Sequence, residues 1–308
     1  MDLRGRDYTA VLDLTADELR ALTESALEMK KRSRAGDRPP LLAGKVLALV
    51  FEKPSLRTHV TFQTGMLQLG GHAIFLGPRE IDMGSRESPW DVAKNLERWV
   101  DAIAARTFTH DTILELARGA RIPVINALSG WEHPCQTLAT LLTIRERFER
   151  LTDVRIAWIG DGNNVLRSLA FATGKLGLSL TMAAPQAYAL DADSIARARA
   201  DAAQSHGTIE MTDDPQRAVA AADVILTDVW TSMGQEQEAV ARRRAFAPYQ
   251  VNAALLARAP RDAVVSHCLP AHRGEEITDE VMDGPRCVAF DEAENRLHTQ
   301  KALLAAIL

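Results

Sequence analysis

Three residues near the start of the chain carry the donor groups that an anion needs. Ser55, Arg57 and Thr58 stand in the segment Phe51-Glu-Lys-Pro-Ser-Leu-Arg-Thr, which follows the apolar run 46–50. The run predicts a strand, and the residues after it have helical periodicity. Because the first turn of a helix presents unpaired N–H groups and the positive end of its dipole, two hydroxyls and a guanidinium there favour a phosphate site. A simple helix cap at Ser55, with Arg57 in solvent, explains the same residues equally well.

Other polar residues follow the ends of further predicted strands. In the first half of the chain these are Arg106, His133 and Gln136, and in the second half they are Asn164, Asp228, Ser232, His267 and Cys268. In parallel α/β sheets the ligand lies outside the carboxyl ends of the strands, so two facing crevices would gather these groups. Taken singly, Arg106 fits a surface ion pair and Cys268 an inert core thiol. Their joint placement is the stronger indication of a site.

These residues require an alternation of strands and helices to position them, and the sequence has it. Strands are predicted at 73–76, 103–105, 124–128, 154–159, 178–183, 224–227 and 264–266. A capping box, Thr15-Ala-Asp-Glu, opens the first helix, and Pro89 suits the first turn of another. We therefore expect an α/β protein with two doubly wound parallel-sheet domains joined by helices, residues 1–148 and 149–308.

Composition argues against several other classes of protein. The 308 residues are 46% hydrophobic and 25% charged, which is ordinary for a globular protein of two domains. A net charge of −5, with no basic run longer than 30–34, argues against nucleic-acid binding. We expect no membrane span, because no apolar stretch reaches about eighteen residues. The scattered Cys135, Cys268 and Cys287 favour a reducing cytoplasm over a disulfide framework.

Neither an organic cofactor nor a metal is predicted. Gly160-Asp-Gly-Asn-Asn follows a strand and opens a helix, but Val165 occupies the place of the third glycine of a dinucleotide-binding fingerprint. No acidic residue ends the next strand, where Ala183-Ala-Pro stands. His267 and His272 are separated by a proline, and no carboxylate partners recur at helical metal-ligand spacing. A Walker loop and a G-x-S-x-G elbow are both absent.

Four motifs, in order and at suitable separations, resemble those of the ornithine carbamoyltransferases. They are Phe51-Glu-Lys-Pro-Ser-Leu-Arg-Thr58, His133-Pro-Cys-Gln136, Asp228-Val-Trp-Thr-Ser-Met-Gly234 and His267-Cys-Leu-Pro270. The likeness runs essentially end to end and includes Tyr249-Gln-Val-Asn252 and Glu294-Asn-Arg296. Within the wider transcarbamylase superfamily, the Asp…Ser-Met-Gly element points to ornithine rather than aspartate.

The resemblance implies an activity and an assembly. The δ-amine of L-ornithine would attack the carbonyl carbon of carbamoyl phosphate, giving L-citrulline and phosphate in arginine metabolism, without a cofactor or a metal. The enzyme would be a cytoplasmic homotrimer or a multiple of trimers. Residues 1–148 would bind carbamoyl phosphate and 149–308 ornithine, and a last helix over about 291–308 is expected to return to the first domain.

The resemblance also implies roles for individual residues. Catalysis would depend on Arg57, Thr58, Arg106, His133, Gln136 and Cys268. The carbamoyl phosphate site would comprise Ser55, Leu56, Arg57, Thr58, Asp82, Arg86, Arg106, His133, Pro134, Cys135, Gln136, Cys268, Leu269 and Arg296. Ornithine would be held by Asn164, Asp228, Ser232 and Met233, with Asp228 pairing with its α-ammonium.

Two departures from the family pattern carry expectations of their own. His59 and Gln63 stand where the family usually has an Arg and a Glu, so a neutral hydrogen bond is expected in place of their ion pair. Asp82 stands where the family commonly has a Gln that reaches the neighbouring subunit. Because an acidic group repels phosphate, we hypothesise that Arg86 supplies the contact to the adjoining protomer instead.

Three other functions are weighed against this one. The first is a carbamoyltransferase of another amine, such as putrescine or an N-acylornithine, although a diamine without an α-ammonium would not need Asp228. The second is a doubly wound binding protein that has lost catalysis, which the presence of Arg57, Arg106 and His133 disfavours. The third is a dehydrogenase. Flux toward arginine synthesis and flux toward arginine breakdown both fit the sequence.

Overall fold

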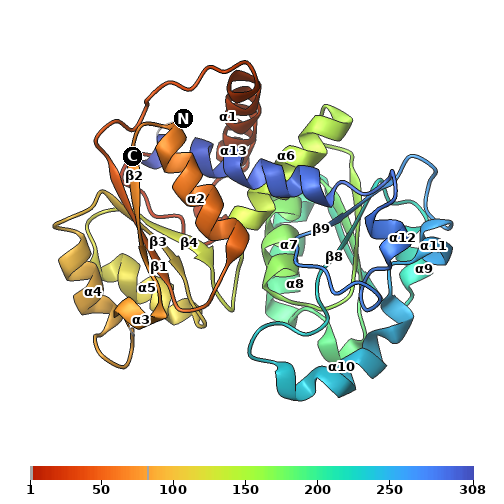
Figure 1. The fold of residues 1–308 in the computed structure, drawn as a ribbon. Coiled ribbons are helices and arrows are strands. Elements are labelled where there is room, and N and C mark those ends of the chain that lie inside the picture. Colours follow the sequence, from red (N-terminus) through yellow and green to blue (C-terminus); the bar gives the residue numbers. More distant parts are fainter. Residues whose placement is uncertain (1–2, 82) are drawn as a thin grey trace. The chain divides into compact units, whose positions relative to one another are not determined.

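Figure 1 shows the computed structural model, which describes residues 3–81 and 83–308. The chain forms two compact units. Unit 1 contains the described residues up to Leu142 together with Glu294–Leu308, and unit 2 is Thr143–Ala293. Two helices, α6 (Pro134–Phe148) and α13 (Ala289–Ile307), contribute residues to both units. The expected return of the last helix to the first part of the chain is confirmed, although α13 begins earlier than predicted.

A parallel sheet of four strands forms the centre of unit 1, in the order β2-β1-β3-β4. The strands are β1 (Val46–Phe51), β2 (His72–Leu76), β3 (Ala102–Arg106) and β4 (Val124–Leu128). β3 is buried along its whole length, as a parallel strand covered on both faces should be. After β1 the chain adds β2 on one side and then β3 on the other, so the topological switch point lies between β1 and β3.

Short-range signals in the sequence explain where the helices of unit 1 begin. The elements are η1 (Val11–Asp13), α1 (Ala16–Arg34), α2 (Leu56–Gln68), α3 (Pro78–Ile81), α4 (Pro89–Leu96) and α5 (His110–Gly119). The capping box of Thr15 and Glu18 is present at the start of α1. Ser88 caps α4, and Pro89 is the first residue of that helix. Val92 of α4 and Ile113 of α5 pack against Val50 and Ile103 of the sheet.

Unit 2 repeats this plan with a parallel sheet of five strands in the order β7-β6-β5-β8-β9. The strands are β5 (Arg155–Ile159), β6 (Ser179–Ala183), β7 (Thr208–Thr212), β8 (Val224–Thr227) and β9 (Val264–His267). Here the direction of strand addition reverses between β5 and β8, where Ile159 pairs with Thr227. The two doubly wound parallel sheets confirm the predicted fold class, and β7 is an additional edge strand with little burial.

The helices of unit 2 are α7 (Asn164–Leu176), α8 (Ala192–Ser205), α9 (Pro215–Val219), α10 (Ala239–Phe246), α11 (Ala253–Leu256) and α12 (Asp279–Met282), with the short helices η2 (Gln186–Tyr188), η3 (Glu236–Glu238) and η4 (Ala247–Tyr249). α7 and α8 pack closely because Gly174 lacks a side chain. A Cβ built on Gly174 would come within 2.5 Å of the Ala198 carbonyl oxygen.

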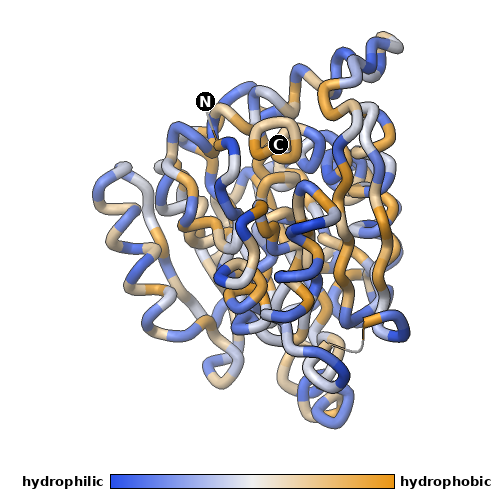
Figure 2. Tube along the Cα trace, turned by 90° about the vertical axis from the view of Figure 1, so that its left-hand side faces the viewer, coloured by the Kyte–Doolittle hydropathy of each residue, from blue (hydrophilic) through white to orange (hydrophobic). Residues whose placement is uncertain are grey.

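Apolar residues cover the faces of both sheets. In unit 2, Val219 of α9 and Tyr249 of η4 pack against Ile159, Ile225 and Val265. Figure 2 shows the alternation of hydrophilic and hydrophobic residues along the helices that such one-sided packing requires. Within 3–81 and 83–308, every helix is too short or too polar to cross a bilayer.

Candidate functional site: a cationic cluster and a buried carboxylate

The residues after β1 form the start of α2, as the sequence predicts. Ser55 is extended and caps the helix, its Oγ accepting a hydrogen bond of 3.2 Å from the backbone N–H of Thr58. Thr58 is buried, Arg57 is half-buried, and Leu56 exposes 72% of its surface. The cap and the anion site are therefore compatible, because the cap uses one N–H group of this helix end.

Arg106 reaches the same edge of the sheet through strand register. Phe51, the last residue of β1, pairs with Arg106, the last residue of β3. The backbone N–H of Glu52 donates to the carbonyl oxygen of Arg106 at 2.9 Å, which fixes the loop to this strand end. Both chain segments thus leave the sheet at its switch point, where parallel α/β sheets bind ligands.

α6 and α13 bring in the remaining polar groups of unit 1. His133 precedes α6, Gln136 lies in its first turn, and both are buried. From α13, one Arg296 nitrogen donates to Gln136 Oε1 at 2.7 Å, and another donates to Thr58 Oγ1 at 3.0 Å. Three predicted site residues that are distant in sequence are therefore in direct contact.

The pKa of His133 shows how cations gather around it. Burial holds that pKa well below its ordinary value of 6.5, and the charges of Arg296, Arg106, Lys53 and Arg57 lower it further, in that order of effect. His133 is consequently neutral, and it can donate or accept one hydrogen bond at each ring nitrogen. The group formed by these four cations, His133, Thr58 and Gln136 is called the cationic cluster below.

Lys53 belongs to this cluster, although sequence reasoning did not assign it a role. Its side chain is buried, and its Nζ lies 4.9 Å from the centroid of the Phe108 ring. Burial lowers the pKa of Lys53 to about 8, and the positive charge of Arg106 adds to the effect. The available signal was the position of this lysine in the loop directly after a buried strand, two residues before Ser55.

Pro134 and Cys135 stand between His133 and Gln136 in the chain and make structural contacts. The carbonyl oxygen of Pro134 accepts a hydrogen bond of 3.4 Å from the buried Tyr8 hydroxyl. The Cys135 thiol donates to the carbonyl oxygen of Asn126 at 3.4 Å. Because burial raises the pKa of this thiol to about 12, Cys135 is not a nucleophile near neutral pH.

A buried carboxylate marks the switch point of unit 2. Asp228 follows β8, and its Oδ2 accepts from Asn163 Nδ2 at 2.7 Å. Its Oδ1 accepts from the Cys268 thiol and from the Val229 backbone N–H, each at 2.8 Å. Asn163 was not predicted, because the sequence pointed to the neighbouring Asn164, which is the first residue of α7. The missed signal is the capping position, since Asn163 Oδ1 also accepts from the first turn of α7.

The other residues predicted for unit 2 lie on two further segments. Ser232 and Met233 follow Trp230, the Ser232 N–H donates to Gln235 Oε1 at 3.0 Å, and Met233 exposes 47% of its surface. Leu269 has a left-handed backbone with φ of 60°, and its N–H donates to His267 Nδ1 at 2.8 Å.

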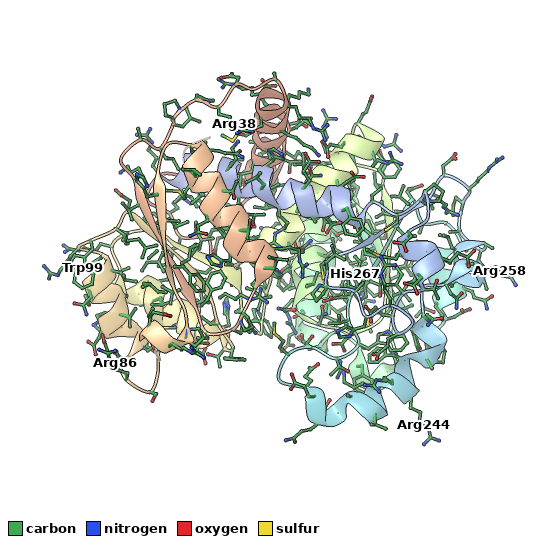
Figure 3. The ribbon with its side chains drawn as sticks, in the orientation of Figure 1. Arg38, Arg86, Trp99, Arg244, Arg258 and His267 are labelled. Carbon is green, nitrogen blue, oxygen red and sulfur yellow. The ribbon has the colours of Figure 1, made fainter. Side chains whose placement is uncertain are left out.

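Two groups of residues in unit 2 have metal-ligand atoms near one another, namely Asp228, His267 and Cys268, and His272, Glu275 and Glu276. His267 lies inside unit 2 (Figure 3). Its two ring nitrogens are already engaged, Nε2 by Glu276 at 3.1 Å and Nδ1 by Leu269. In the second group Glu275 pairs with Arg243 at 3.2 Å. Both groups are thus explained by internal contacts, and neither is assigned a metal.

The predicted hydrogen bond between His59 and Gln63 is wrong, because the buried His59 Nε2 has no hydrogen-bond partner among the residues that the structure describes. The His59 ring instead stacks on Phe75, with centroids 4.0 Å apart. Arg86 is exposed on the loop between α3 and α4 (Figure 3). Its Nε lies 3.9 Å from Glu87 Oε1. Asp82 lies outside the described residues.

Each unit thus carries polar groups at its switch point. The cationic cluster of unit 1 suits a small dianion, and the buried carboxylate of unit 2 suits an ammonium group. This combination is typical of a group transferase with a phosphorylated donor and an amine acceptor.

Comparison with known proteins agrees with this class. The family model described as the carbamoyl-P binding domain of aspartate/ornithine carbamoyltransferase matches residues 6–146, and that of its Asp/Orn binding domain matches 152–307. The chain belongs to the aspartate/ornithine carbamoyltransferase family.

Similar proteins include the ornithine carbamoyltransferase of Halalkalibacterium halodurans, 48% identical over 100% of this chain and 97% of that protein. The anabolic ornithine carbamoyltransferase of Pyrococcus furiosus is 47% identical over 100% of this chain and 98% of its own length. The solved structure of an ornithine carbamoyltransferase from Pyrococcus furiosus is similar to this chain with a TM-score of 0.97 at 47% identity, covering 100% of this chain and 98% of that chain.

Proposed function

We propose that this protein transfers the carbamoyl group of carbamoyl phosphate to the δ-amine of L-ornithine, giving L-citrulline and phosphate. The observation that carries the proposal is the cationic cluster, in which four positive side chains act on one buried, neutral histidine. The names of the full-length relatives, ornithine carbamoyltransferases at 47–48% identity, support the choice of acceptor.

Carbamoyl phosphate is assigned to unit 1. The phosphate dianion accepts from the N–H groups at the start of α2, from Ser55 and Thr58, and from the guanidinium of Arg57. Arg106 bridges the phosphate and the carbonyl oxygen, and His133 and Gln136 orient the carbamoyl group. Arg296 holds Thr58 and Gln136 in place from the side of α13.

Catalysis follows from donors that are in place before the reaction begins. Attack of the amine converts the carbonyl oxygen into an oxyanion and expels phosphate, so negative charge grows at both ends of the donor molecule. Arg106, His133 and Thr58 meet that charge without having to reorganise. The attacking amine must be neutral, and desolvation on binding lowers its pKa from about 10.

Ornithine is assigned to unit 2, with Asp228 pairing with its α-ammonium. The amino-acid end of ornithine is also bound by Asn164, Ser232 and Met233. The reacting amine lies beside Cys268 and Leu269. Since Asp228 is buried and already accepts from Asn163 and Cys268, its position is fixed before the substrate arrives. Putrescine lacks the α-ammonium and an N-acylornithine masks it, so neither uses this carboxylate fully.

We also propose that the protein works in the cytoplasm as a homotrimer or a multiple of trimers. Unit 1 exposes large apolar side chains on α2 and on the edge strand β2, namely Leu56, Val60, Leu67, Ile74 and Phe75. An apolar surface beside an unpaired strand edge favours subunit contact. Arg86 is the candidate contact to the adjoining protomer's phosphate. Light scattering coupled to gel filtration tests the assembly, and a monomer of 33.8 kDa would refute it.

An acceptor panel tests the activity. The purified protein is incubated with carbamoyl phosphate and either L-ornithine, putrescine, N-acetylornithine or L-aspartate, and carbamoylated products are measured by chromatography. The proposal expects product with L-ornithine at a rate at least about a hundredfold above the others. Activity with aspartate alone, or none with any amine from a folded protein, refutes it. An Arg57→Met variant controls for contaminating enzyme.

A further inference from the structure

A buried ion pair in unit 2 lies beside the proposed ornithine residues. Arg242 of α10 places Nη2 2.6 Å from Asp161 Oδ1, and both side chains are almost fully buried. The guanidinium also lies over two aromatic rings, 4.7 Å from the centroid of Tyr188 and 5.4 Å from that of Phe246. Such a stacked, paired arginine has one defined position.

The same guanidinium bonds the chain segment that follows β8. Arg242 Nε donates a hydrogen bond to the carbonyl oxygen of Trp230, which stands midway between Asp228 and Ser232. The Trp230 ring stacks on Phe246 with an interplanar angle of 16°, so α10 contacts both the main chain and the side chain of this residue. Trp230 is therefore attached to α10 at two points.

Arg242 joins the two loops that meet at the switch point. Asp161 belongs to the loop after β5, and Trp230 belongs to the segment after β8. The hydrogen bond from Asn163 to Asp228 joins the same two loops at a second place. Beyond Trp230, Ser232 and Gly234 form local hydrogen bonds, to Gln235 and Glu236. Arg242 is thus a long-range hydrogen-bonded anchor directly before that segment.

We propose that Arg242 is a positioning residue for the acceptor: by holding Trp230 against Asp161, it sets where Ser232 and Met233 stand relative to Asp228. This inference rests on the assignment of ornithine to unit 2. Without Arg242, the segment after Trp230 would keep its local turn but lose its attachment, and the acceptor would meet Ser232 and Met233 in the wrong place.

The electrostatics of the pair explain why substitution has a specific effect. Burial is the main cause that raises the pKa of Asp161, which stands at about 6; the charge and hydrogen bond of Arg242 lower it, and the nearby Asp228 and Glu238 act in the same direction as burial. Removing the arginine leaves Asp161 buried beside other acids, so it takes up a proton. A lysine at this position retains a positive charge to pair with Asp161. It lacks the planar guanidinium, whose additional N–H donor bonds the Trp230 carbonyl oxygen.

The experiment compares three variants of the full-length protein by steady-state kinetics. Arg242→Met removes the anchor, Arg242→Lys keeps only its charge, and Arg244→Met is the matched control. Arg244 lies two residues further along the same helix, is exposed, and extends outward (Figure 3). KM for each substrate, kcat and the melting temperature are measured for each variant.

For Arg242→Met we expect a rise of about thirtyfold in KM for L-ornithine with less than about a twofold change in KM for carbamoyl phosphate. Arg242→Lys should show the same selectivity with a rise of about fivefold, and Arg244→Met should match the wild type. If Arg242→Met does not fold, Arg242→Lys decides the question. An unchanged KM for ornithine, or an equal rise in both KM values, overturns the inference. Failure of the proposed function would appear separately, as a wild-type protein inactive with ornithine.

Discussion

The Arg296 guanidinium donates a hydrogen bond to Thr58 Oγ1 at 3.0 Å, which joins the C-terminal helix to the first turn of α2. A second Arg296 nitrogen donates a hydrogen bond to Gln136 Oε1 at 2.7 Å. The last helix therefore does more than pack on unit 1, because it fixes the hydroxyl and the amide that the proposed donor substrate needs.

Replacing Arg296 should therefore impair both binding and catalysis. Arg296→Met removes two charge-assisted hydrogen bonds and a positive charge, so we expect kcat/KM for carbamoyl phosphate to fall about a hundredfold or more. Arg296→Lys, which cannot reach both partners, should recover only part of the loss. Initial rates at saturating ornithine measure the effect. Arg34→Met is the control, since Arg34 bonds Glu294 on the exposed side of the same helix, and an equal loss in that variant would contradict the prediction.

Lys53 should make the affinity for carbamoyl phosphate depend on pH. Its pKa, lowered to about 8 by burial and by Arg106, means that the free protein loses this charge as pH rises through about 8. A bound dianion favours the protonated amine, so affinity should be fully present below that pH and should decline above it. Binding above pH 8 should also take up a proton.

Isothermal titration calorimetry with carbamoyl phosphate alone, in buffers of different ionisation enthalpy, tests this linkage without the titration of ornithine. Lys53→Met should bind more weakly below pH 8 and show no proton uptake above it. Lys45→Met is the control, because Lys45 is a partly exposed partner of Asp101. Proton uptake in Lys53→Met equal to that of the wild type would assign the titration to another group.

His133 should act as a neutral hydrogen-bonding group throughout the working pH range. Because burial and four surrounding cations hold its pKa well below the ordinary value, its protonation should not appear as an inflection near pH 6.5 in kcat. His133→Ala should lower kcat about a hundredfold, and His133→Gln, which keeps an N–H donor, should retain more activity. Equal activity of the two variants would mean that the donor is not used.

Asp228 should account for the choice between ornithine and a diamine. Asp228→Asn keeps the shape of the side chain but removes its charge, so KM for L-ornithine should rise about a hundredfold, corresponding to about 3 kcal/mol. The rate with putrescine should change much less, because putrescine has no α-ammonium. The ratio of kcat/KM for the two amines measures this selectivity, and a ratio equal to that of the wild type would exclude the proposed pairing.

The sequence predicts the fold well because parallel sheets leave a strong local signal. Strands buried on both faces read as short apolar runs, and the polar residues directly after them mark the ligand edge. This reasoning located Ser55, Arg106 and Asp228 at strand ends that the structure confirms.

The residues that sequence reasoning missed act through contacts that spacing does not encode. Lys53 gains its importance from burial beside Arg106, and Asn163 from a capping position that also faces Asp228. Arg242 is one of three consecutive arginines in α10, and only the packing shows which of them is buried. His59 was expected to bond Gln63, but the ring of Phe75 from the neighbouring strand offered a stacking surface instead.

The most direct test of the account follows the carbonyl carbon itself. Carbamoyl phosphate labelled with ¹³C at that carbon is mixed with L-ornithine and the protein, and the label is followed by NMR while released phosphate is measured. The account predicts that the label moves into the ureido carbon of L-citrulline, with one phosphate released for each citrulline formed. Label that reaches only bicarbonate, or phosphate released without citrulline beyond the rate without protein, would contradict it.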